Sequence, residues 1–184
     1  MPIELVKDSW PGAVRAVTIG ATPEEGGTRT STVTVGGEKA LPFMHFEVEM
    51  PNRPVVAVEL RDRRPDDWST LLLDTWGDVV DDPAAWAKAA EQAGADVLQL
   101  SLSATDANGN PTTPEAAVAT VKAILRASGL PLIVFGPGLV DLDNELLVAV
   151  ADATKGERLL LGICEDKNYR TIVAAALAHG HVVN

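Results

Sequence analysis

From residue 55 onward the chain repeats one pattern four times: an apolar segment, a polar loop containing Gly or Asp, and an amphipathic segment that ends in Gly. Such repeated strand–helix units are typical of an α/β fold with a parallel sheet. The predicted strands span residues 55–60, 96–102, 131–135 and 158–163. Residues 181–184 predict the start of a fifth strand, and because strands usually run about five or six residues, the sequence looks cut there.

Local signals place the helices between these strands. Asp82-Pro83 and Thr113-Pro114 are typical helix starts, since a side-chain oxygen can cap the first turn and Pro fits the first helical position. We expect helix ends near Gly94, Gly129, Gly156 and Gly180. The predicted apolar faces are Trp86, Ala89, Ala90 and Ala93; Ala117, Val121, Ile124 and Leu125; Leu146, Leu147 and Val150; and Tyr169, Ile172, Val173, Ala176 and Leu177. Residues 131–135 are almost wholly apolar, which favours a strand covered on both faces.

The first 50 residues differ from the rest. Residues 13–19 and 30–35 alternate polar and β-branched side chains around a Gly-rich stretch, which predicts an antiparallel hairpin. Residues 41–46 lead into Pro51 and Pro54 and are expected to form a packed approach to the α/β part. We therefore divide the chain into an N-terminal hairpin with a packed extension (1–50) and an α/β domain (51–184).

Composition excludes several classes of function. Lys and Arg total 15 against 26 Asp and Glu, for a net charge of −11, and this field repels nucleic-acid phosphates. No apolar run approaches the roughly 18 residues of a membrane span. Residues 1–8 lack a secretory signal, so we expect a cytoplasmic protein. The single cysteine, Cys164, cannot hold an iron–sulfur cluster or a Cys-rich zinc site.

Ligands of parallel α/β proteins bind at the carboxyl ends of the strands, so the candidate binding residues lie in the loops that follow them. Asp106 and Asn108 follow the second strand, although a turn-rich connection explains them as well, and the calcium-loop pattern fails on spacing. Gly136 and Gly138 flank Pro137 after the third strand, where a backbone could approach an anion, but a dinucleotide fingerprint is incomplete. Asn168 could donate a neutral hydrogen bond after the fourth strand.

Other polar groups point to no chemistry. Residues 61–68 mix both charges and are interpreted as a solvated or partner-facing rim rather than a catalytic pair. Cys164 is interpreted as a small buried apolar group. His45, His179 and His181 lack the spacing of a metal site, and we predict neither a catalytic residue nor a metal ligand.

Several stretches resemble one family across essentially the whole chain. They are Gly36-Gly37-Glu38-Lys39-Ala40-Leu41-Pro42-Phe43, His45-Phe46-Glu47, Asn52-Arg53-Pro54-Val55, Gly94-Ala95-Asp96, Glu157-Arg158-Leu159-Leu160-Leu161-Gly162 and Asn168-Tyr169. In these the chain is similar to small (delta) subunits of the corrinoid/iron–sulfur protein of the CO dehydrogenase/acetyl-CoA synthase complex, also called acetyl-CoA decarbonylase/synthase.

This resemblance implies a (β/α)8 TIM barrel, of which the chain would be the N-terminal half, about four βα units plus the start of a fifth strand, preceded by the hairpin. It also implies a non-catalytic subunit that helps a large corrinoid/iron–sulfur subunit enclose a corrinoid (cobalamin), while this chain holds no cluster. The corrinoid would carry a methyl group from methyltetrahydropterin to acetyl-CoA synthase, with a methyltransferase and the synthase as transient partners.

An alternative function stays open: a pterin-dependent methyltransferase on the related barrel, binding methyltetrahydrofolate through groups such as Asp106 and Asn168. A complete barrel takes about 250 residues, so 184 residues would leave exposed sheet edges. We therefore expect the isolated chain to self-associate through those edges or to form an open sheet.

Overall fold

The computed structural model describes residues 6–184, so residues 1–5 of the predicted N-terminal domain lie outside the described part. Its main feature is a five-stranded parallel sheet in the order β3-β4-β5-β6-β7, with every strand beside the next one in the chain. The strands are β3 (Ala57–Arg61), β4 (Val97–Ser101), β5 (Leu132–Phe135), β6 (Leu160–Gly162) and β7 (Val182–Val183). The predicted α/β fold and the predicted strand at residues 181–184 are confirmed.

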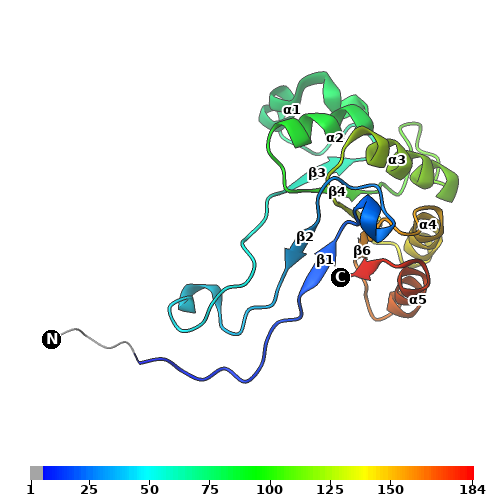
Figure 1. Ribbon diagram of the computed structural model, residues 1–184. Coiled ribbons are helices and arrows are strands. Elements are labelled where there is room, and N and C mark those ends of the chain that lie inside the picture. Colours follow the sequence, from blue (N-terminus) through cyan, green and yellow to red (C-terminus); the bar gives the residue numbers. More distant parts are fainter. Residues whose placement is uncertain (1–5) are drawn as a thin grey trace.

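Within residues 6–184, five α-helices and one hairpin complete the fold. The helices are α1 (Thr70–Trp76), α2 (Pro83–Gln92), α3 (Pro114–Ala127), α4 (Val140–Ala153) and α5 (Tyr169–His179), with short 3₁₀ turns η1 (Pro23–Glu25), η2 (Pro42–Met44) and η3 (Gly77–Asp81). The predicted hairpin is confirmed as β1 (Val17–Ile19) paired antiparallel with β2 (Val33–Val35). In Figure 1 the helices lie in an arc around one side of the sheet. No helix within residues 6–184 is long and apolar enough to cross a bilayer.

The helix-start predictions hold because capping depends on adjacent residues. The side chain of Asp82 accepts a hydrogen bond from Ala84 N at 2.9 Å, and that of Thr113 accepts one from Ala116 N at 3.2 Å. Each helix then begins with Pro. Both caps satisfy N–H groups that the helix itself leaves unpaired.

Three parts of the predicted helical pattern are wrong. No element was predicted over residues 70–81, where the structure has α1 and η3. Ala93 was predicted on the apolar face of α2, but it lies past the last turn and is exposed. Tyr169 and Leu177 were predicted on the apolar face of α5, but both are exposed. The buried face of that helix is formed by Ile172 and Ala176. Gly129 does not form a left-handed end of α3, which ends at Ser128; a Cβ at residue 129 would overlap the side chain of Thr30.

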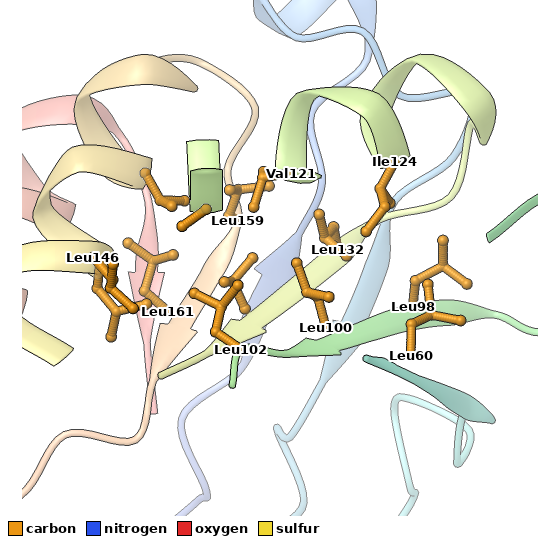
Figure 2. Close-up of a cluster of buried hydrophobic side chains, with 14 of the residues drawn as sticks. Leu60, Leu98, Leu100, Leu102, Val121, Ile124, Leu132, Leu146, Leu159 and Leu161 are labelled. Atoms are coloured by element: carbon orange, nitrogen blue, oxygen red, sulfur yellow. The ribbon is translucent and has the colours of Figure 1, made fainter. Parts of the chain in front are cut away.

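The helices bury only one face of the sheet. Leucine and valine side chains from β3 to β6 pack against α3 and α4 in one cluster (Figure 2). Along β5, Leu132 and Val134 are buried in this cluster, whereas Ile133 and Phe135 on the opposite face stay partly exposed. The expectation that this strand is covered on both faces is therefore wrong for the described residues, since successive side chains alternate between faces.

The hairpin contacts the amino-terminal end of the sheet. Gly20 N donates to Arg158 O at 2.8 Å, and Thr30 N donates to Gly129 O at 2.9 Å. In contrast, residues 6–16 and 36–52 run away from the sheet (Figure 1). Leu41, Phe43 and Phe46 are exposed, so the expected packed approach is not formed by these side chains.

His181 connects α4, β6 and β7 through a buried neutral imidazole. Its Nδ1 accepts from Leu159 N at 3.1 Å, and its Nε2 donates to Ala151 O at 2.9 Å. Burial lowers the pKa of His181 below its ordinary value, because a charged ring would lose solvation. Protonation would also place a second N–H against Leu159 N.

We therefore expect an acid-dependent loss of stability from His181. The contribution of the neutral ring is fully present above the unfolded-state pKa of about 6.5 and decreases as the pH falls below it, by at most about 1.4 kcal/mol per pH unit. Urea denaturation between pH 7.5 and 5.5 measures this slope. His181→Gln should be less stable than wild type but should have a shallower slope, while exposed His45→Gln should keep the wild-type slope. Equal slopes for wild type and His181→Gln would contradict this role.

Candidate functional site

A cavity of about 430 Å³ opens where strands β3 to β6 end. We call it the strand-end cavity. Arg61, Ser101 and Phe135 are the last residues of β3, β4 and β5, and Ile163 directly follows β6; all four line it. Because the strands are parallel and in register, their carboxyl ends meet at one edge of the sheet, which is the edge where α/β proteins bind ligands.

Polar side chains lead into this cavity along the sheet face that the helices leave uncovered. Glu59 lies beside Gln99, and Arg61 lies beside Ser101, in two registered pairs on the same face of the sheet. Ser101 Oγ donates to Glu59 Oε1 at 2.9 Å, and Arg61 Nε lies 3.0 Å from the same oxygen. These half-buried groups form a polar row that ends at the cavity.

The loop after β3 supplies the cavity with cations. Arg63 and Arg64 line it together with Arg61. Arg63 Nη1 lies 3.4 Å from Asp66 Oδ2, and Arg64 Nη1 lies 3.0 Å from Asp81 Oδ1. This loop was interpreted as a solvated or partner-facing rim, and the structure adds that its three arginines line the cavity at the strand ends. The position of Arg61 at the end of a strand could have indicated this.

Asp62 attaches that loop to the one after β4. Its carboxylate accepts hydrogen bonds from Ser103 N at 2.9 Å and from Ser103 Oγ at 2.6 Å. Ser103 and Ala104 both line the strand-end cavity. The two loops therefore hold one wall of the cavity as a unit, and both carboxylate oxygens of Asp62 accept a hydrogen bond.

Asp106 and Asn108 lie further out, in a loop that folds on itself. The carboxylate of Asp106 accepts from the backbone N–H groups of Asn108 and Asn110 and from Asn110 Nδ2, at 2.8, 2.9 and 3.1 Å. These bonds, the side-chain bond first, lower the pKa of Asp106. Asp106 lines a second cavity of about 630 Å³, which also reaches Arg63 and Arg64. Asn108 is exposed and lines neither cavity.

Gly136 and Gly138 lie in the loop between β5 and α4, held by a buried carboxylate. Gly138 N donates to Asp143 Oδ1 at 3.1 Å. A Cβ at residue 136 would overlap that oxygen, so the close approach requires Gly there. Burial raises the pKa of Asp143, while hydrogen bonds from the backbone of Gly138 and Leu139 oppose the rise. Gly136 lines the strand-end cavity, whereas Gly138 lies outside it with a left-handed φ of +80°.

Asn168 closes the loop between β6 and α5. It is buried, with Oδ1 accepting from Glu165 N at 2.6 Å and Nδ2 donating to Ile163 O at 3.3 Å. Cys164 is half-buried, and burial raises the pKa of its thiol, which favours the unreactive protonated form. Asn168 therefore supports the shape of the wall around Ile163.

Of the five residues proposed from sequence, the structure thus brings Gly136 to the strand-end cavity and Asp106 to its neighbour. Asn108, Gly138 and Asn168 line neither. The residues that sequence analysis missed are Arg61, Arg63, Arg64, Ser101 and Ser103. Together with the apolar surfaces of Phe135 and Ile163 they can bind a ligand that combines apolar faces with hydrogen-bond acceptors.

Comparisons with known proteins agree with the resemblance seen in the sequence. The family model described as the CO dehydrogenase/acetyl-CoA synthase delta subunit matches residues 16–184. Acetyl-CoA decarbonylase/synthase complex subunit delta of Archaeoglobus fulgidus is 38% identical over 192 residues, covering 100% of this chain and 42% of that protein. The Methanopyrus kandleri subunit is 37% identical over 94% of this chain and 43% of its own length.

Subunit delta 1 of Methanosarcina thermophila is 36% identical over 95% of this chain and 40% of that protein. The chain thus spans about two fifths of the length of the curated relatives it matches. Because one model covers most of the chain and these relatives share more than a third of its residues, the chain belongs to the CO dehydrogenase/acetyl-CoA synthase delta subunit family.

Proposed function

We propose that this chain is a non-catalytic part of a corrinoid protein, in which its strand-end cavity covers one side of a corrinoid held mainly by a large corrinoid/iron–sulfur subunit. The observation that carries the proposal is the mixed chemistry of that cavity. Phe135 and Ile163 offer apolar surface, and Ser101 and Ser103 offer hydroxyls, which suit the apolar faces and amide-bearing rim of a corrinoid. Membership of the family supports the same assignment.

The size of the cavity favours a cover over an enclosing site. Its volume of about 430 Å³ lies in the lower part of the range for drug-sized ligands, about 300–1,000 Å³, and a corrinoid is larger than such ligands. A second chain must then surround most of the group. The 184 residues contain one cysteine, so an iron–sulfur cluster would also need ligands from another chain.

The bound corrinoid would supply the methyl-carrying chemistry of the complex, accepting the group from methyltetrahydropterin and passing it to acetyl-CoA synthase. The residues of this chain would orient the group and limit its contact with water. We place this assembly in the cytoplasm, with the methyltransferase and the synthase as transient partners. We also propose that the sheet is half of a (β/α)8 barrel, because each strand pairs with its successor and all helices cover one face.

A bulky substitution in the strand-end cavity tests whether this cavity covers the corrinoid. Ala104 is half-buried and lines the cavity, so Ala104→Trp should obstruct the corrinoid surface. An overpacked contact costs about 1–3 kcal/mol. We therefore expect the complex of this variant with the large subunit to retain about tenfold less corrinoid, the equivalent of about 1.4 kcal/mol. Corrinoid absorbance per complex measures it.

The control for this experiment is Ala174→Trp on the exposed side of α5, which should retain the corrinoid. Unchanged retention in Ala104→Trp would contradict the cover. The alternative, a pterin-dependent methyltransferase, is decided by titrating the chain alone with methyltetrahydrofolate and cobalamin. Tight pterin binding with methyl transfer by this chain would overturn the non-catalytic assignment.

A further inference from the structure

Two arginines that line the strand-end cavity each carry one buried donor that makes no hydrogen bond. Within the described residues, Arg61 Nε and Arg63 Nε are each shielded from solvent and make no hydrogen bond. Arg61 Nε lies 3.0 Å from Glu59 Oε1 but not in hydrogen-bond alignment. Buried polar groups in proteins are nearly always paired. Arg63 Nε is such an exception, and Arg61 Nε is balanced only by the charge of Glu59, so both guanidinium groups keep unused donor capacity at this cavity.

Three arginines and two aspartates line the cavity, so an anion can bind there only where an arginine exchanges its carboxylate partner for the ligand. The chain has a net charge of −11, yet Arg61, Arg63 and Arg64 meet at this one place. The acidic partner of Arg63, Asp66, has a side chain that is 76% exposed, and exposed pairs of this kind stabilise a protein by only about 0–1 kcal/mol. A ligand inside the cavity can therefore replace Asp66 as the partner of Arg63.

We infer that the strand-end cavity binds an oxyanion, a phosphate or carboxylate group of a small molecule, through the guanidinium groups of Arg61 and Arg63. A guanidinium presents its N–H donors in a planar fork that matches two oxygens of such a group. Arg64 lies on the same wall and is paired with Asp81. The inferred site lies in the cavity of the proposed function, but it does not require a corrinoid or a partner subunit.

Calorimetric titration of the 184-residue chain with inorganic phosphate, and separately with succinate, tests this site and distinguishes the two kinds of oxyanion. We expect saturable binding of at least one anion that weakens as NaCl is added. Arg61→Gln and Arg63→Gln should each weaken it about 10- to 100-fold, the usual range for losing a hydrogen bond to a charged group. Arg126→Gln, which removes an exposed arginine of α3, should bind as wild type does.

Arg63→Lys distinguishes the contribution of the guanidinium hydrogen bonds to anion binding from that of the positive charge, and it also serves as a folded control. It keeps the positive charge but lacks the Nε donor, so we expect binding weaker than wild type and stronger than Arg63→Gln. Circular dichroism shows whether each variant is folded, and Arg63→Lys preserves the comparison if a Gln variant is not. The inference is overturned if neither anion binds or if the Arg61 and Arg63 variants bind with wild-type affinity. Since no corrinoid is present, this result is independent of the Ala104→Trp experiment.

Discussion

Arg29→Ala is expected to lower the free energy of unfolding by about 3–5 kcal/mol, the usual cost of removing one partner from a buried ion pair. The side chain of Arg29 is 1% exposed and that of Glu157 is 13% exposed, with Nε 3.1 Å from Oε2. Its Nη1 also donates to Ser128 O and Leu130 O, and Nη2 donates to Leu125 O. Burial lowers the pKa of Arg29, and Glu157 opposes this.

The large effect follows from the position of Arg29. Residue 29 lies between the two strands of the hairpin, while its acceptors lie at the end of α3 and before β6. The carbonyl groups after Ile124 have no partner within α3, so the guanidinium satisfies the helix end as well as Glu157. Its loss leaves several buried acceptors unpaired at once.

Urea denaturation at neutral pH measures the change. Arg29→Lys should recover only part of the stability, because an ammonium cannot match the planar fork. Arg15→Ala removes an exposed arginine near the same hairpin and should stay within about 0.5 kcal/mol of wild type. If Arg29→Ala were as stable as Arg15→Ala, the hairpin would not depend on this contact.

Trp86→Ala is the second large expected effect, a loss of about 3–5 kcal/mol as for other large-to-small aromatic substitutions in a core. Trp86 on α2 is fully buried and packs edge-on against Trp68 and at a tilt against Trp76, with ring centroids 5.3 and 6.1 Å away. These two partners belong to the loop after β3 and to α1. Removing the indole should also loosen the loop after β3, which carries Arg63 and Arg64, and should therefore weaken anion binding in the strand-end cavity.

Trp86→Phe provides the matched comparison. Trp86 Nε1 is buried without a hydrogen-bond partner among the described residues, so Phe loses ring volume but removes an unpaired donor. We expect it to cost clearly less than Trp86→Ala by urea denaturation. Leu71→Ala, at a position that is 76% exposed on α1, should change stability by less than about 0.5 kcal/mol. Similar losses in Trp86→Phe and Trp86→Ala would show that ring packing is not the source of the effect.

The sequence alone predicted the features that neighbouring residues control. Asp82-Pro83 and Thr113-Pro114 begin helices because their caps bond to backbone two or three residues away. The apolar strands alternate with helices along the chain, so the α/β class could be read directly. Gly94, Gly156 and Gly180 take left-handed φ values of +92°, +91° and +80° near helix ends, as predicted. Gly129 was predicted to end a helix, but glycine is needed there because the side chain of Thr30, 99 residues earlier, leaves no room for a Cβ.

The structure has a cavity at the edge of the sheet where the sequence predicted a site, but most of the residues that line it are not the predicted ones. Asn168 and Asp106 are polar loop residues whose hydrogen bonds are used within their own loops. A sequence cannot distinguish such a residue from one that faces a ligand, because both patterns are polar and contain turn-forming residues. In the sequence, Arg61 and Arg63 belong to a segment of mixed charge that is typical of a surface. In the folded chain, both line the cavity at the strand ends.

The sequence by itself determined the strand–helix repeat, the hairpin and the family, since periodicity, caps and characteristic stretches act over a few residues. Only the tertiary structure decided which face of the sheet is covered, that Arg29 is buried, and that two arginine Nε donors at the strand-end cavity lack hydrogen bonds. The physical reason is that burial and hydrogen-bond pairing depend on neighbours that are distant in sequence. Residues 29 and 157, or 61 and 101, share an environment only after the chain has folded.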